Sequence, residues 1–149
     1  MIKDNFPIKG DLHILIKDAL TGEVKVDRLE KNLVVTVGKE WIASRMVGTA
    51  ANTMGYMAVG TDATSPASGD TTLGAEVARV ATTVSGGTAS TNTVTYVATF
   101  PAGTGTGALT EAGILNASTS GTMLSRTTYS VINKGSGDEM TITWVVSVG

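Results

Sequence analysis

The chain has 149 residues, among them 18 glycines, one histidine and no cysteine, and its formal net charge is −2. This length is sufficient for one domain with its own hydrophobic core. The absence of cysteine excludes disulfides, thiolate zinc sites and cysteine nucleophiles, and the charge excludes a strongly basic surface of the kind that binds nucleic acid or an anionic membrane.

An N-terminal arm, residues 1–10, is predicted to precede a single β-domain at residues 11–149. Pro7 and Gly10 interrupt any regular element in the arm. The arm carries apolar Ile2 and Phe6 beside Pro7, and we predict that these three residues contact a neighbouring subunit. The alternative is that the arm folds back as an extra strand of its own sheet.

Alternating apolar and polar residues predict most of the strands. In the last segment every second residue, from Met140 to Val148, is apolar, which turns one face of that strand toward a core. Short Gly- and Asp-containing turns separate neighbouring strands. The predicted extended segments are residues 11–17, 23–29, 32–36, 56–59, 77–84, 93–100, 108–116, 122–132 and 139–148.

One short helix is predicted near residues 38–47. Val37 and Trp41 are four residues apart, as are Ile42 and Met46, so that one apolar stripe faces inward. Gly48 follows and can end the helix in a left-handed conformation. Many short strands with a single helix predict an all-β fold, either a β-sandwich or a jelly roll.

The charge is unevenly distributed along the chain. Only 16% of the residues are charged, against about 25% in an ordinary soluble domain, and most of them precede residue 47. A surface of Thr, Ser, Gly and Ala is poorly protected against association, so we expect partners to cover much of it. The alternative is a neutral, Thr-rich surface of the kind that many extracellular β-modules present.

No segment of the sequence predicts membrane insertion or secretion. No apolar run approaches the roughly 18 residues that span a bilayer, and the first residues lack the apolar stretch of a secretory signal. We expect a soluble protein, made in a cytoplasm, that binds neither nucleic acid nor a membrane.

Few residues offer chemistry. His13 is the only histidine, and a triad or a histidine metal site needs partners that are absent from its sequence neighbourhood; we interpret it as a surface residue of a strand. The glycine-rich residues 103–107 lack the Lys-Ser/Thr of a phosphate-binding loop, so they are interpreted as a connection between strands.

Four carboxylates are the remaining catalytic candidates: Asp62, Asp70, Glu76 and Glu111. Glycosidases need two such groups across a sugar-binding cleft, and we predict no such pair and no catalytic residue. The loop between Asp62 and Asp70 could hold Ca²⁺ through oxygen ligands, but ordinary turn chemistry is the preferred interpretation, and no metal or cofactor is expected. Arg79 and Arg126 are predicted to form structural ion pairs with Glu76 or Glu111.

Six segments of the chain carry a resemblance to known proteins: residues 32–46, 57–70, 72–79, 110–116, 122–126 and 131–138. Together they resemble a family of small structural proteins of tailed-phage virions and domains of phage fibre proteins. The resemblance implies a virion component without catalysis, either a capsid decoration (cement) protein or a piece of a fibre. The absence of a stalk repeat favours decoration of the head.

The resulting functional hypothesis is a non-enzymatic capsid decoration protein on the outer surface of a phage head. Its expected partners are the major capsid protein and copies of itself, in a homo-oligomer. The first alternative is a tail-fibre or baseplate-associated structural or receptor-binding protein. The second is a phage-borne carbohydrate hydrolase, which the missing acid pair opposes.

Overall fold

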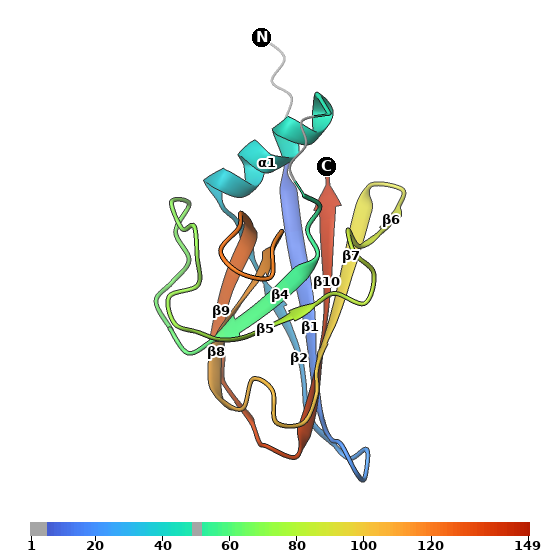
Figure 1. Cartoon of the computed structure of the whole chain (residues 1–149), viewed down its shortest axis with the longest axis vertical. Helices are drawn as coiled ribbons and strands as arrows, with labels where there is room; N and C mark the ends of the chain where they lie inside the picture. The colour runs from blue at the N-terminus through green and yellow to red at the C-terminus, as the bar shows by residue number, and fades with distance from the viewer. Residues whose placement is uncertain (1–5, 49–51) are drawn as a thin grey trace.

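The computed structural model describes residues 6–48 and 52–149. Over this part of the chain two antiparallel sheets of five strands each pack face to face, and a helix crosses one end of them (Figure 1). This architecture confirms the predicted all-β sandwich with one short helix. Phe6 and Gly149 lie together beside the helix, and we call this end of the sandwich the helix end. The opposite end, which carries the turn at residues 19–23, is the hairpin end.

Sheet A contains the first and last strands of the chain. It consists of β1 (Ile8–Asp18), β2 (Val24–Lys31), β6 (Thr88–Ser90), β7 (Thr93–Phe100) and β10 (Asp138–Val148). The spatial order is β2-β1-β10-β7-β6. β1 and β10 pair along their whole lengths, from Ile8 opposite Val148 to Asp18 opposite Asp138, so that the two strands form one continuous ladder between the ends of the sandwich.

Sheet B covers the other side of the core. It consists of β3 (Leu33–Val34), β4 (Tyr56–Gly60), β5 (Glu76–Ala81), β8 (Gly107–Leu115) and β9 (Met123–Lys134). The spatial order is β3-β9-β8-β4-β5. β8 runs without interruption through Gly113. A Cβ atom at Gly113 would lie only 3.0 Å from the Leu73 side chain and 3.2 Å from the Ser125 carbonyl, so glycine is needed here for close packing rather than for a bend.

The alternation predicted for the last strand is confirmed. Met140, Ile142 and Trp144 are fully buried, whereas Thr141 and Thr143 between them are partly exposed on the outer face of sheet A. Burial of large side chains in the middle of the sandwich removes most of their apolar surface from water, which is the dominant stabilising contribution to such a fold. The core therefore lies where the sequence pattern of this strand places it.

The structured domain begins earlier than the sequence predicted. β1 starts at Ile8, three residues before the expected start at residue 11, and the Gly149 N–H donates to the Pro7 carbonyl at 2.8 Å. Gly10 does not interrupt the strand. Glycine fits there because a Cβ atom would clash with the side chain of Asn32. Residues 8–10, assigned to the arm from the sequence, thus belong to sheet A, and β6 was not predicted at all.

The helix, α1 (Thr36–Met46), begins two residues before the predicted start. It lies directly on β9. The missing side chain of Gly38 allows this close approach, since a Cβ atom there would clash with the Leu124 backbone. Gly48 adopts φ +69° after the last turn, as predicted. The prediction that Met46 faces inward is wrong: Met46 is 86% exposed, because α1 crosses the end of the sandwich and its last turn extends beyond the strands (Figure 1).

Candidate functional site

A buried ion pair joins two neighbouring strands of sheet B. Glu111 on β8 is fully buried and Arg126 on β9 is 3% exposed. The Arg126 guanidinium donates from Nε to Glu111 Oε2 at 3.0 Å, and its Nη2 forms an ion-pair contact of 2.9 Å with the same oxygen. Burial lowers the pKa of Arg126, but the hydrogen bonds to Glu111 and Asp70 outweigh it and raise the pKa above its ordinary value. The Arg126 guanidinium is therefore held in its charged form.

The same ion pair holds the loop at residues 61–75 against sheet B. Glu111 accepts hydrogen bonds from the N–H groups of Gly74 and Ala75, at 2.9 and 2.7 Å, and from that of Asp62 at 3.3 Å. These buried N–H groups need an acceptor, because a buried backbone donor without a partner costs free energy. Glu111 thus accepts hydrogen bonds from backbone N–H groups that a neighbouring strand would satisfy in a regular sheet.

Two aspartates of the loop complete the cluster. Asp70 accepts from Arg126 Nη1 at 3.0 Å and from the Ala67 N–H at 2.9 Å. Asp62 lies 3.7 Å from Arg126 Nη2 and accepts from the Thr64 N–H, which lowers the pKa of Asp62. Both aspartates thus bind protein donors in a loop that they help to fold.

The structure brings three of the four candidate carboxylates together around one arginine, but in an arrangement that holds a loop. The fourth, Glu76, pairs with Arg79 at 2.7 Å, so the predicted ion pairs of Arg79 and Arg126 are confirmed. General acid–base catalysis needs a carboxyl group that can reach a substrate proton, whereas Glu111 has no exposed surface. Within residues 6–48 and 52–149, no group of three or more His, Asp or Glu side chains could hold a metal ion.

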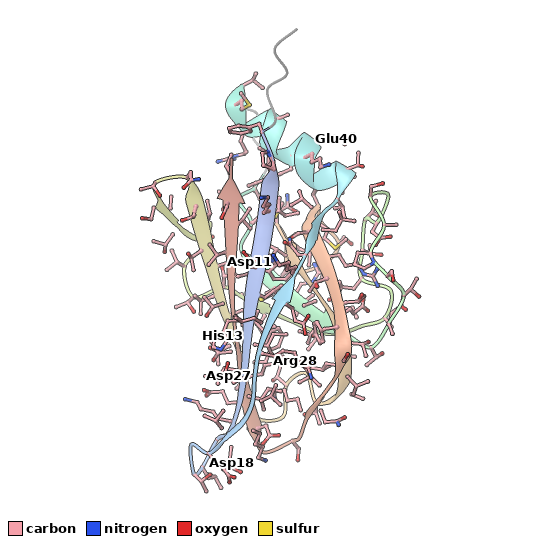
Figure 2. All side chains as sticks on the ribbon, turned by 180° about the vertical axis from the view of Figure 1, so that it is seen from behind. Asp11, His13, Asp18, Asp27, Arg28 and Glu40 are labelled. Atoms are coloured by element: carbon pink, nitrogen blue, oxygen red, sulfur yellow. The ribbon has the colours of Figure 1, made fainter. Side chains whose placement is uncertain are left out.

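The β1–β2 hairpin is rich in charged residues, and Figure 2 shows Asp11, Asp18, Asp27 and Arg28 on this side of the molecule. His13 is on the outer face of β1, with Nε2 2.6 Å from Asp27 Oδ1, and its side chain is 38% exposed. It is a surface residue of a strand, as predicted. Residues 103–107 connect β7 to β8, also as predicted. Among the described helices, none is long and apolar enough to cross a membrane.

A second polar cluster, missed from the sequence, stabilises the hairpin end. Lys134 is 2% exposed and donates to the carbonyls of Asp138 and Pro101, at 2.6 and 3.1 Å, and burial lowers the pKa of Lys134. The Asp138 side chain accepts from Lys25 Nζ at 2.6 Å and from the Gly135 N–H at 2.8 Å. The sequence indicated only a tight turn here, because Lys25 is more than a hundred residues away.

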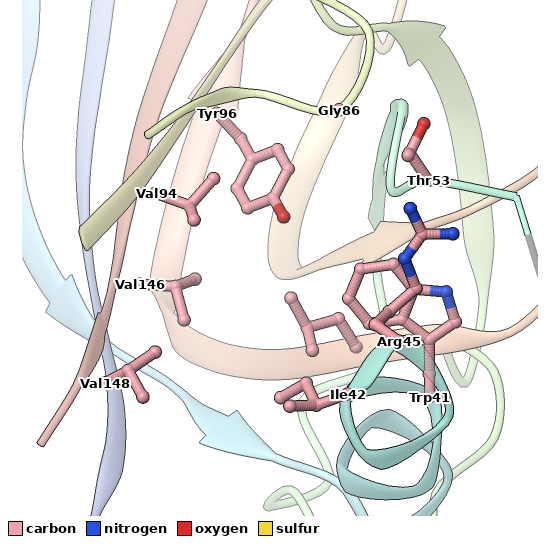
Figure 3. Close-up of a pocket in the computed structure, with 10 residues that line it drawn as sticks. Trp41, Ile42, Arg45, Thr53, Gly86, Val94, Tyr96, Val146 and Val148 are labelled. Carbon is pink, nitrogen blue, oxygen red and sulfur yellow. The ribbon is translucent and has the colours of Figure 1, made fainter. Parts of the chain in front are cut away.

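The helix end contains an apolar groove of about 320 Å³ between α1 and sheet A. Figure 3 shows side chains from α1, β7 and β10 that face one another across it. Three exposed apolar side chains lie at the same end of the molecule: Phe6 is 70% exposed, Met46 86% and Val47 79%. The residues lining the groove are Trp41, Ile42, Arg45, Thr53, Gly86, Val94, Tyr96, Leu124, Val146 and Val148.

Sequence reasoning did not find this groove. Its walls come from a helix and two strands that are separated by about fifty residues or more along the chain, and each wall alone is an ordinary apolar stripe. Of the three arm residues proposed as partner contacts, Phe6 and Pro7 lie at the helix end, beside Gly149. Ile2 lies outside the described residues.

Comparison of the chain with protein-family models, with curated proteins and with solved structures finds no significant match.

Proposed function

We propose that the protein is a non-enzymatic structural component of a tailed-phage particle that decorates the outer surface of the head. Its partners are the major capsid protein and copies of itself. The assignment to a phage particle comes from the resemblance of residues 32–46, 57–70 and the later segments described above. The assignment of a binding role rests on the physical character of the helix end.

The observation that carries the proposal is the gathering of exposed apolar surface at the helix end. Phe6, Met46 and Val47 are each at least 70% exposed, and the groove beside them is lined mainly by aliphatic and aromatic side chains. Exposed apolar side chains at the same end of a molecule as an apolar groove are typical of sites that bind other proteins. A domain that attaches through this end leaves its remaining faces outward.

The uncharged part of sheet A supports the same role. The outer faces of β7 and β10 carry threonines at alternate positions, and the hydroxyls of Thr99 and Thr141 lie 3.2 Å apart across the two strands. The charged residues Asp11, Asp27 and Arg28 lie instead on the β1–β2 side (Figure 2). Contacts made by such a domain depend on shape and apolar burial more than on charge, which suits attachment that tolerates changes of ionic strength.

The polar clusters of the domain support a structural role rather than a chemical one. The buried carboxylate of Glu111 is used to fold a loop, and the buried ammonium of Lys134 is used to close a turn. Buried charges that are fully paired fix one conformation of the backbone around them. A rigid domain of this kind loses little conformational entropy on binding.

The copy number of the protein in purified particles tests the proposal. Quantitative mass spectrometry against the major capsid protein is expected to give a copy number of the same order as that of the capsid subunits. A copy number comparable to that of a tail-fibre protein would assign the chain to the fibre or baseplate instead. Absence of the protein from purified particles would overturn the virion assignment altogether.

A further inference from the structure

The groove at the helix end presents a polar group that no described residue satisfies. Tyr96 on β7 is 4% exposed, and its ring points into the groove with the hydroxyl toward α1 (Figure 3). Within the described residues this hydroxyl has no hydrogen-bond partner, and burial raises the pKa of Tyr96 to about 12. The hydroxyl opens into the groove (Figure 3). Covering it without a hydrogen-bond partner would cost free energy, so an occupant of the groove gains by offering it one.

The walls of the groove fix the rest of the occupant's chemistry. Val94, Val146 and Val148 form an aliphatic wall on sheet A, and Trp41 and Ile42 face it from α1 (Figure 3). A peptide that carries apolar side chains together with backbone carbonyls fits both the aliphatic wall and the single hydroxyl. An apolar chain without acceptors would leave the hydroxyl unsatisfied.

The N-terminal arm of the same chain has this chemistry and leaves the domain at this end. Phe6 is 70% exposed, with its ring edge 3.7 Å from the Cβ position of Gly149. The segment before it contains Ile2 and the polar residues Lys3, Asp4 and Asn5. Fully extended, five residues reach at most about 18 Å, which is long enough to enter a groove of a molecule in contact with this end.

The last described residue of the arm does not occupy the groove of its own chain. The pairing of β1 with β10 continues to the hydrogen bond between the Gly149 N–H and the Pro7 carbonyl. Phe6, the residue before Pro7, is not among the residues that line the groove, and its side chain stays 70% exposed. Its apolar surface is therefore open to a second copy.

We propose that the groove at the helix end binds the N-terminal arm of a second copy of this chain. Ile2 and Phe6 of the arm pack on the aliphatic wall, and a backbone carbonyl of the arm accepts from the Tyr96 hydroxyl. Because the arm and the groove lie at the same end, two copies that meet end to end exchange arms reciprocally and form a closed two-fold pair. This inference rests on the part of the proposed function in which the chain assembles with itself.

The absence of cysteine permits a direct cross-linking test with single-cysteine variants of the full chain. Lys3→Cys marks the arm and Thr53→Cys marks the groove, where Thr53 is an exposed lining residue. Leu20→Cys, at a residue that is 97% exposed at the hairpin end, is the matched control. Two variants are mixed, oxidised mildly and separated by mass under denaturing conditions.

The mixture of Lys3→Cys with Thr53→Cys is expected to give a covalent species of twice the chain mass, well above the amount from Lys3→Cys with Leu20→Cys. Equal amounts in the two mixtures would overturn the proposal. The variant with both Lys3→Cys and Thr53→Cys in one chain tests the competing arrangement. If it closes an internal disulfide at the single-chain mass while the mixture stays uncross-linked, the arm occupies its own groove and the proposal is wrong.

Self-association of the purified protein provides an independent measurement. Phe6→Ala is expected to weaken the pair by about tenfold or more in sedimentation equilibrium, from the loss of buried aromatic surface. Tyr96→Phe keeps the ring and removes only the hydroxyl, so a smaller but measurable weakening is expected. Unchanged self-association in both variants would contradict the proposed occupant.

The outcome is independent of the particle experiment. Cross-linking uses purified protein alone, whereas the copy number is measured on particles. A high copy number without arm exchange leaves the proposed function in place and removes this inference. Arm exchange in a protein that is absent from particles supports this inference and removes the proposed function.

Discussion

Arg126 and Glu111 form an ion pair inside sheet B, and the same Glu111 carboxylate accepts the N–H groups of Gly74 and Ala75 from the loop above it. The stability of the sheet and the order of the loop therefore depend on one pair of side chains. The loop buries one large apolar side chain, Leu73, in a small second hydrophobic cluster, and the ion pair adds the polar contacts that hold the rest of the loop.

Replacement of Arg126 by Met is expected to lower the free energy of unfolding by about 3–5 kcal/mol, because it leaves a buried carboxylate without its cation. Urea denaturation followed by tryptophan fluorescence measures the loss. Asp27→Asn serves as the control, since the Asp27–His13 pair is largely exposed and such pairs contribute about 0–1 kcal/mol. Similar losses in the two variants would show that the buried pair does not hold the loop.

Trp144→Ala is expected to destabilise the protein by about 3–5 kcal/mol, as for other large buried aromatic residues. Trp144 is fully buried at the centre of β10. Thr141→Ala and Thr143→Ala, on the outer face of the same strand, are expected to cost less than about 1 kcal/mol each. Thermal unfolding followed by circular dichroism compares the three variants. Equal costs on both faces would mean that a partner or another part of the chain covers the outer face.

Acid is expected to destabilise the hairpin end through Asp138. The hydrogen bond from Lys25 lowers the pKa of Asp138 below its ordinary value of 3.8. The folded state therefore binds fewer protons than the unfolded chain, and this part of the stability is present above about pH 4 and is lost as the pH falls through the lowered pKa.

The comparison of wild type with Lys25→Met isolates this contribution. The stability difference between the two is expected to be largest near neutral pH and to shrink between about pH 5 and pH 2. Lys9→Met changes the net charge equally at the other end of β1 and is the control. A pH dependence in Lys25→Met identical to that of the wild type would rule out the assigned role of Asp138.

Purified protein is expected to show no hydrolysis of peptidoglycan or of host polysaccharides, measured as the release of reducing ends. Glu111 is buried, and Asp70 accepts hydrogen bonds from Arg126 and Ala67. A rate well above background that disappears in Asp70→Asn, in a variant that keeps the wild-type melting temperature, would contradict the structural role assigned to this cluster.

The strands with strict alternation could be predicted from the sequence. β7 was predicted with its observed bounds, and β10 with an error of one residue. In both strands one face is buried and the other is open, which imposes the period of two on the sequence. β6 was missed because its three residues are all exposed, so that no burial pattern marks it.

The sites were less predictable because they depend on contacts between distant segments. The ion pair of Arg126 with Glu111 could be predicted because both are isolated charges in apolar surroundings. The loop, however, is held through hydrogen bonds from its backbone N–H groups to Glu111. Every residue type except proline has such a group, so the sequence does not indicate this contact. The groove at the helix end required the position of α1 over β7 and β10. That position depends on close packing at Gly38, which the helical pattern alone does not contain.

Deletion of residues 1–7 tests most directly whether the protein acts by attachment through its helix end. Phe6 is largely exposed and β1 begins at Ile8, so the melting temperature of the isolated domain is expected to stay nearly unchanged. The amount of protein retained on phage heads after sedimentation, relative to the wild type, is the decisive measurement, and it is expected to fall sharply. A truncated protein that melts at a lower temperature but is retained on heads as well as the wild type would contradict attachment through the arm.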